Sequence, residues 1–137
     1  MTKTIRIIVL FFVLYVGVVA MFESMLGYFQ PENQQSLVMT TYDIGSGEAH
    51  NRVLSRIEHD GQLFVAVNHW PRQWYYRLLE NNQVQVRYED ISGAFTATKV
   101  DGADEAALRQ ARPLGLGFRI LTGFPPRYFV ELTPNAP

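Results

Sequence analysis

The chain has 137 residues, of which 47% are hydrophobic and 13% aromatic, and this is enough for one folded domain. A formal net charge of -1 argues against nucleic-acid binding, because domains that bind phosphate backbones normally carry a clear basic excess. The absence of cysteine excludes disulfides, thiolate metal sites and cysteine nucleophiles, while the compartment stays open.

The N-terminal segment is apolar enough to enter a membrane. An uninterrupted apolar run extends from Ile7 to Phe22, with Lys3 and Arg6 before it and Glu23 after it. Together with residues 24–26 it approaches the roughly 20 residues that span a bilayer. We therefore predict a single-pass transmembrane helix within residues 1–29. The basic residues on its N-terminal side favour a cytoplasmic N-terminus, with the domain on the other side.

Two alternatives to a retained anchor stay open. Small residues at 17–20 suit a cleaved signal peptide. A helix that lies on the membrane surface would instead leave the domain in the cytoplasm. Residues 30–36 are polar, contain a proline and read as a linker, so the folded domain is expected to cover residues 37–137.

The domain reads as mostly β. Alternating or β-branched runs predict about six strands, and Asp60-Gly61 is a strong hairpin signal between two of them. Residues 71–81 and 105–112 predict two short helices, and 115–118 a turn. Such a pattern suggests a small barrel with helices over its open ends. The predicted strands are 37–42, 51–59, 63–67, 84–88, 95–100 and 127–132.

One stretch combines aromatic and basic side chains. Four aromatic residues lie within seven positions, a composition suited to stacking on a flat anionic ligand. In a small barrel most of these rings would be expected to pack in the core or over an open end, with at least one of Trp70, Trp74 and Tyr76 facing outward. The stretch contains Trp70, Trp74, Tyr75 and Tyr76, flanked by Arg72 and Arg77.

An ordered set of motifs between Thr40 and Pro134 resembles the deazaflavin-dependent nitroreductase or quinone reductase family. That resemblance implies a split β-barrel, a deazaflavin coenzyme or FMN, and reduction of a lipophilic acceptor such as a quinone or a nitro compound. It also implies a possible homodimer. The motifs are Thr40-Thr41, Gly45-Ser46-Gly47-Glu48, Asp60-Gly61, Pro71-Arg72-Gln73-Trp74-Tyr75, Leu78-Leu79-Glu80-Asn81-Asn82, Val84-Gln85-Val86 and Tyr128-Phe129-Val130-Glu131-Leu132-Thr133-Pro134.

The sequence departs from the family pattern where the coenzyme tail is expected. A basic pair helps to hold this anionic tail in the family, and Ile44 and Gly45 stand at those positions here. His50, Arg52, His69 and Arg72 are the residues that would supply the missing positive charge. The full set of predicted cofactor-binding residues is Ser46, His50, Arg52, Asn68, His69, Trp70, Arg72 and Trp74.

These observations lead to two functional hypotheses. The first is a membrane-anchored flavin- or deazaflavin-dependent oxidoreductase that takes its lipophilic acceptor from the bilayer. The second is a non-enzymatic, membrane-tethered binding module that has kept the barrel and lost the coenzyme tail site. No metal is expected, because the three histidines are not at metal-ligand spacing with carboxylates. The sequence assigns no catalytic residue.

Overall fold

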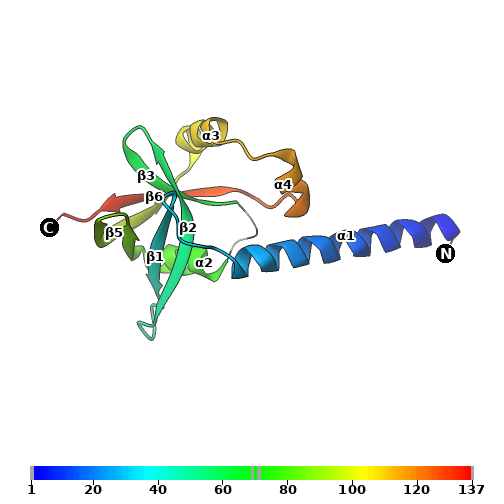
Figure 1. The fold of residues 1–137 in the computed structure, drawn as a ribbon, viewed down its shortest axis with the longest axis horizontal. Coiled ribbons are helices and arrows are strands. Elements are labelled where there is room, and N and C mark those ends of the chain that lie inside the picture. The colour runs from blue at the N-terminus through cyan, green and yellow to red at the C-terminus, as the bar shows by residue number, and fades with distance from the viewer. Residues whose placement is uncertain (1, 69, 71, 137) are drawn as a thin grey trace.

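In the computed structural model, which describes residues 2–68, 70 and 72–136, a long helix leads into a small β-barrel (Figure 1). The described residues form six antiparallel strands that close in the order β1-β2-β3-β6-β5-β4. This confirms the predicted mostly-β barrel. The strands are β1 (Ser36–Tyr42), β2 (Ala49–His59), β3 (Gln62–Val67), β4 (Gln83–Tyr88), β5 (Ile91–Lys99) and β6 (Tyr128–Pro134).

Tight turns join the hairpins. Asp60 and Gly61 both have positive φ, 49° and 76°, as a two-residue turn between β2 and β3 requires. The β4–β5 connection is shorter than predicted: residues 91–93 belong to β5 rather than to a loop. They do so because Ile91 pairs with Tyr88 and Gly93 with Val86, which leaves Glu89 and Asp90 as the turn.

Alternation along the strands builds two apolar clusters. Leu54 on β2 points into the barrel interior, whereas Ile57 lies in a second cluster outside it. Helix α3 (Gly102–Ala111) covers this second cluster with Leu108. Helix α2 (Gln73–Glu80) closes one end of the barrel with its buried residues Trp74, Tyr75 and Leu78. Both helices were predicted, with boundaries that differ by one to three residues.

Helix α4 (Leu116–Leu121) is a difference from the sequence prediction, which placed a turn at residues 115–118. Gly115 and Gly117 produce the turn-like composition. The segment is nevertheless helical, and its Phe118 ring lies edge-to-face against Phe22, with ring centroids 6.0 Å apart. A long-range contact therefore outweighs the weak local helix propensity of the glycines.

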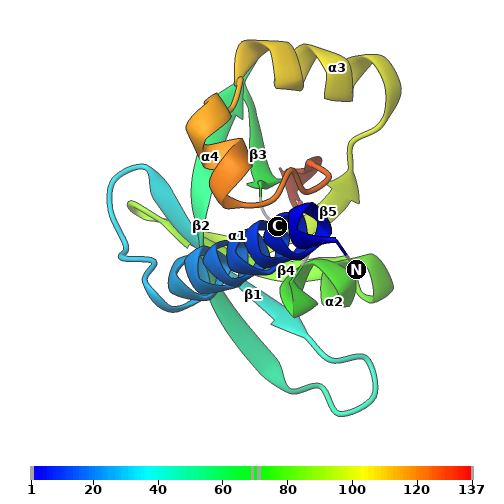
Figure 2. The ribbon, with the colours of Figure 1, turned by 90° about the vertical axis from the view of Figure 1, so that its right-hand side faces the viewer.

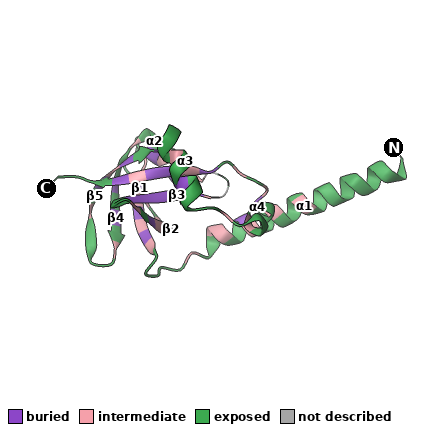
Figure 3. Cartoon of the chain, turned by 90° about the horizontal axis from the view of Figure 1, so that it is seen from above, coloured by how far each residue is buried: buried purple, intermediate pink, exposed green. Residues whose placement is uncertain are grey.

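Helix α1 (Lys3–Tyr28) leaves the barrel as a projecting rod, and its outer part is exposed (Figures 1 and 3). Of the described helices it is the one long and apolar enough to cross a membrane. Viewed along its axis, α1 lies between α2 and α4 (Figure 2). Its C-terminal half contacts the domain, so α1 is part of the folded structure and also a membrane-span candidate.

Candidate functional site

Two predicted site residues, Arg52 and Arg72, meet at the mouth of the barrel under α1. Arg52 on β2 pairs in register with Met39, whose side chain is buried in the barrel, and its Nη1 donates to the Gly27 carbonyl of α1 at 3.0 Å. Arg72 is the residue just before α2. Its guanidinium group lies beside the same glycine, and its atoms are 3.6 Å from the position that a Cβ atom on Gly27 would take. Both guanidinium groups therefore lie against the same turn of α1, around Gly27.

Glu23 of α1 is the carboxylate at this cluster, and sequence reasoning did not assign it to the site. Nη2 of Arg72 donates to Glu23 Oε2 at 3.0 Å and to the Glu23 carbonyl at 2.5 Å. The backbone N–H of Trp70 also donates to Glu23 Oε1, at 3.4 Å. The Glu23 side chain is only 9% exposed. A buried carboxylate thus ties α1 to the segment that leads into α2.

The cluster has more positive charge and more N–H donors than Glu23 satisfies. Nε and Nη2 of Arg52 and Nε of Arg72 are buried and have no hydrogen-bond partner in the described part of the chain. Burial, followed by repulsion from Arg72, lowers the pKa of Arg52. Among the described residues, Glu23 pairs with Arg72 and Arg52 has no carboxylate partner, so an anion would find unused donors here.

The two tryptophans have different environments. Trp74 is buried in the barrel core and lies edge-to-face against Tyr75, with ring centroids 6.0 Å apart. Trp70 is 45% exposed and lies near Gly123, in the turn after α4. Tyr76 on α2 is exposed as well. Trp70 is therefore the more exposed tryptophan, and its backbone lies beside the arginine cluster, whereas Trp74 is a core residue.

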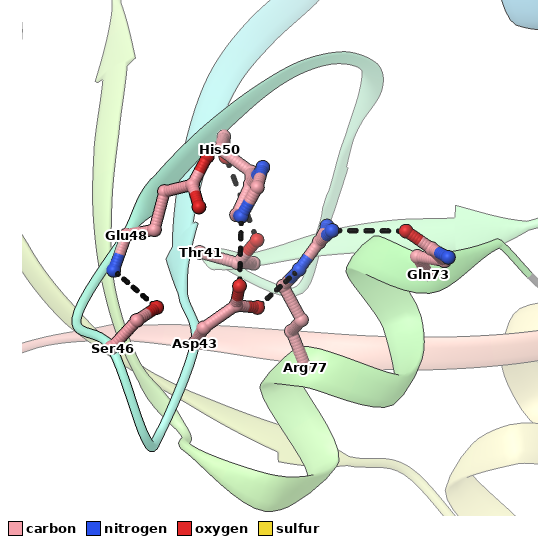
Figure 4. Close-up of polar contacts among 7 residues, drawn as sticks. All are labelled: Thr41, Asp43, Ser46, Glu48, His50, Gln73 and Arg77. Carbon is pink, nitrogen blue, oxygen red and sulfur yellow. Dashed lines mark hydrogen bonds and ion pairs between the residues drawn. The ribbon is translucent and has the colours of Figure 1, made fainter.

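His50 belongs to a second polar network, at the β1–β2 hairpin, and Ser46 lies in the turn of the same hairpin (Figure 4). Asp43 accepts from Arg77 Nε at 2.7 Å and lies 3.1 Å from His50 Nε2, while Arg77 also reaches Gln73 on α2. These hydrogen bonds, with His50 the larger cause and Arg77 the next, lower the pKa of Asp43. Ser46 Oγ accepts from the Glu48 N–H at 3.2 Å and so supports its own turn.

The same hairpin brings possible metal ligands together, which the sequence spacing did not indicate. Ligand atoms of Asp43, Glu48 and His50 lie within 4.8 Å of one another. However, the Arg77 guanidinium already pairs with Asp43. A cation held there would face this fixed positive charge, and ion pairing with Arg77 and His50 already occupies Asp43.

Asn68 lines a pocket that neither Arg52 nor Arg72 lines. Its Oδ1 accepts from Arg127 Nε at 2.7 Å, and Arg127 Nη1 donates to the Arg112 carbonyl. Arg127 is only 8% exposed, and burial, followed by repulsion from Arg109, lowers its pKa. His69 lies outside the described residues. The pocket, of about 280 Å³, is lined by Asn68, Arg109, Pro113, Leu114, Arg119, Thr122, Pro125 and Arg127.

Similar solved structures place this chain in a class of six-stranded split barrels. One described as a domain-swapped dimer has 19% identity and a TM-score of 0.58, over 74% of this chain and 83% of that one. The F420-H2 Dependent Reductase FDR-A has 19% identity and a TM-score of 0.56, over 75% and 98%. HutZ, a heme storage protein from Vibrio cholerae, has 17% identity and a TM-score of 0.56, over 77% and 84%. At these identities the likeness shows the shared fold.

The amino-acid sequence, rather than the structural likeness, identifies the family of this chain. A sequence model described as F420H(2)-dependent quinone reductase matches residues 16–114, which is well over half of the chain. The chain belongs to this family of deazaflavin-dependent oxidoreductases, and the resemblance drawn from its motifs is confirmed. The matched region begins inside α1, so it includes the part of the helix that carries Glu23 and Gly27.

Proposed function

We propose that this protein is a membrane-anchored, deazaflavin-dependent oxidoreductase that reduces a lipophilic acceptor such as a quinone. The observation that carries the proposal is the Arg52–Arg72 pair, which has unused N–H donors directly beneath the apolar helix α1 in a member of this family. An anionic coenzyme and an acceptor dissolved in lipid would meet at this end of the barrel.

The donor set fits the anionic tail of a deazaflavin coenzyme. Arg52 and Arg72 would hold the tail, since a guanidinium offers several N–H groups in a fixed fork. Trp70 would contribute a partly exposed indole close to the tail site, since its backbone N–H donates to Glu23. The bound coenzyme supplies hydride, whereas the protein supplies position and exclusion of water. The family match supports a deazaflavin rather than FMN.

Several contacts favour a retained α1 over a cleaved signal segment. Removing residues up to Ala20 would delete the hydrogen bond from Tyr15 to the Ile120 carbonyl and the contact of Val19 with Gly123. The apolar character of α1 supports insertion of this helix into a membrane. The flanking Lys3 and Arg6 favour a cytoplasmic N-terminus. The division into an anchor, a linker and a barrel domain is part of this proposal. A homodimer belongs to it too, because one structural neighbour is a domain-swapped dimer.

A second candidate function is a non-enzymatic, membrane-tethered binding module. Two observations favour it. Glu23 already pairs with Arg72, and the exposed turn at Ile44 and Gly45 lacks the basic pair that holds the coenzyme tail in the family. In this case Glu23 would be the permanent partner of the arginines, and the mouth of the barrel would bind no coenzyme.

The test is coenzyme binding by the full-length protein in nanodiscs of phosphatidylcholine. The quenching of Trp70 and Trp74 fluorescence is followed while oxidised deazaflavin coenzyme, or FMN, is added; oxidation of reduced deazaflavin by a quinone is assayed in parallel. We expect Arg52→Gln to weaken deazaflavin binding by about 10-fold or more, the value of a charged hydrogen bond. Arg87→Gln is the matched control, because Arg87 is exposed and pairs with Glu32.

The outcomes separate the two candidates. Binding that Arg52→Gln weakens and Arg87→Gln leaves unchanged supports the oxidoreductase. The absence of any saturable quenching by either ligand in the wild-type protein supports the binding module. Binding of deazaflavin that both variants leave unchanged would place the coenzyme away from the arginine pair.

A further inference from the structure

We propose that α4 and the turn after it, residues 116–124, lie in the headgroup–acyl boundary of the bilayer and form a second membrane contact beside α1. This inference rests on the membrane anchoring in the proposed function and goes beyond it. It turns a domain tethered by one helix into a barrel that sits on the membrane with a defined edge facing the lipid.

The part of α1 that is free of the domain is too short to cross a bilayer by itself. Tyr15 Oη donates to the Ile120 carbonyl at 2.7 Å, so contact with the domain begins halfway along the helix. The free part, residues 3–14, is about 18 Å long at ~1.5 Å per residue, whereas the hydrocarbon core of a bilayer is about 30 Å thick. A span of about 20 residues that starts at Lys3 ends near Phe22. If α1 crosses the membrane in this arrangement, Ile120 lies at membrane depth.

Residues 116–124 present a mostly apolar outer surface. Phe118 turns inward against Phe22, while four other apolar side chains of the segment face outward. Arg119 lies over the Phe124 ring, 5.3 Å from its centroid, so its stem covers apolar surface while its charge can reach the headgroups. This pairing of apolar residues with an arginine is typical of helices at a membrane interface. The exposed apolar residues are Leu116, Ile120, Leu121 and Phe124.

The backbone at the end of α4 is largely satisfied within the protein. The last four carbonyls would need water in an ordinary exposed helix, yet three of them have a protein donor here. The Phe118 carbonyl accepts from the N–H and the hydroxyl of Thr122, and the Arg119 carbonyl accepts from the Phe124 N–H at 2.9 Å. The Ile120 carbonyl accepts from Gly123 N–H and from Tyr15. Internally satisfied carbonyls are what a segment needs where water is scarce.

This placement holds the mouth of the barrel against the lipid. The residues of α1 that follow Tyr15 contact the turn after α4 through Val19 and Gly123, and Glu23 and Gly27 then reach Arg72 and Arg52. A molecule that leaves the bilayer beside α4 therefore arrives at the arginine pair. The lipid surface is the occupant of the apolar face because α1, itself the membrane helix, runs alongside it.

The absence of cysteine permits a direct test with full-length protein. Single variants Ile120→Cys, Leu10→Cys and Ile91→Cys are labelled with a small environment-sensitive fluorophore and reconstituted into phosphatidylcholine vesicles. Quenching is compared with and without phosphatidylcholine that carries a nitroxide on its acyl chain. Ile91 is the matched control, since it is exposed to a similar extent as Ile120 (45% against 43%) and is the first residue of β5, a strand on the side of the barrel away from α1 (Figures 1 and 3).

We expect strong quenching at residue 10, and quenching at residue 120 at least about twofold greater than at residue 91, as for a helix immersed by ~5–10 Å. Quenching at residue 10 with equal, weak quenching at residues 120 and 91 would overturn the inference and leave the anchor intact. Weak quenching at all three positions would remove the membrane anchoring itself, and the inference with it.

Discussion

Two arginine–carboxylate pairs lie at α2, one just before its first residue and one in its last turn, and they differ in the hydrogen-bond donors that they leave without a partner. At the hairpin, Asp43 is shared by Arg77 and His50, and Arg77 has a further partner in Gln73. At the α1 contact, Glu23 satisfies part of Arg72, while Arg52 keeps two buried donors without a partner. The first network is complete, whereas the second has donors left for an anion.

Burial separates the two pairs as well. The Glu23 side chain is 9% exposed and Asp43 is 38% exposed. Exposed ion pairs contribute little to stability, whereas removing one member of a buried pair leaves a charge that water cannot solvate. The hairpin network therefore stabilises the conformation of a loop. The α1 network holds the helix against the barrel, and we expect binding specificity there.

The largest effect should follow from Glu23→Gln. This change leaves Arg52 and Arg72 facing each other without a counter-charge, so we expect a loss of about 2–3 kcal/mol in the free energy of unfolding. This is less than the ~3–5 kcal/mol of a fully buried pair because Arg72 is 31% exposed. Urea unfolding of the protein in detergent micelles measures it.

The same variant distinguishes the two functional candidates. If the arginines bind an anionic coenzyme, Glu23→Gln should raise coenzyme affinity even as it lowers stability, because a competing carboxylate is gone. Loss of stability with no coenzyme binding in either protein would mean that Glu23 is the permanent partner of the pair. Unchanged stability would show that the buried contact is not formed in solution.

We expect an effect of intermediate size, on deazaflavin binding, from two matched substitutions, one in each network. Arg72→Gln should weaken deazaflavin binding by about 10-fold, since it removes a charged donor from the incomplete cluster. Arg77→Gln should change binding by less than about twofold, because its donors are already used by Asp43 and Gln73. Fluorescence titration in nanodiscs measures both. Equal losses would make the hairpin network part of the coenzyme site.

Much of the barrel could be predicted because its determinants are local. The Asp60-Gly61 turn and the alternation of buried residues fix hairpins and faces without any long-range information. Helix α4 could not be predicted in this way. Its glycines favour a turn. The helix packs through Phe118 against Phe22, about a hundred residues earlier in the chain, and a local sequence pattern does not contain this contact.

The candidate site was predicted in part, for the same reason. Arg52 and Arg72 were both expected to gather charge, and the structure brings them together. Asn68 was expected beside them but pairs with Arg127, 59 positions away, and Ser46 and His50 belong to the hairpin. Glu23 was read as the end of an apolar run. An acidic residue near the end of a long apolar helix is the one sequence signal for a buried partner.

The smallest expected effect is a dependence of stability on pH that comes from the hairpin network around Asp43. Hydrogen bonds from His50 and Arg77 lower the pKa of Asp43, so the folded state favours the charged carboxylate. The resulting stability is present above the ordinary aspartate pKa of 3.8 and is lost as pH falls through the lower pKa of the folded state. Asp43→Asn removes this dependence. Thermal unfolding of both proteins between about pH 6 and pH 3 should show curves that converge on acidification. A stability difference that stays constant over this range would mean that Asp43 acts through hydrogen bonds that an amide also makes.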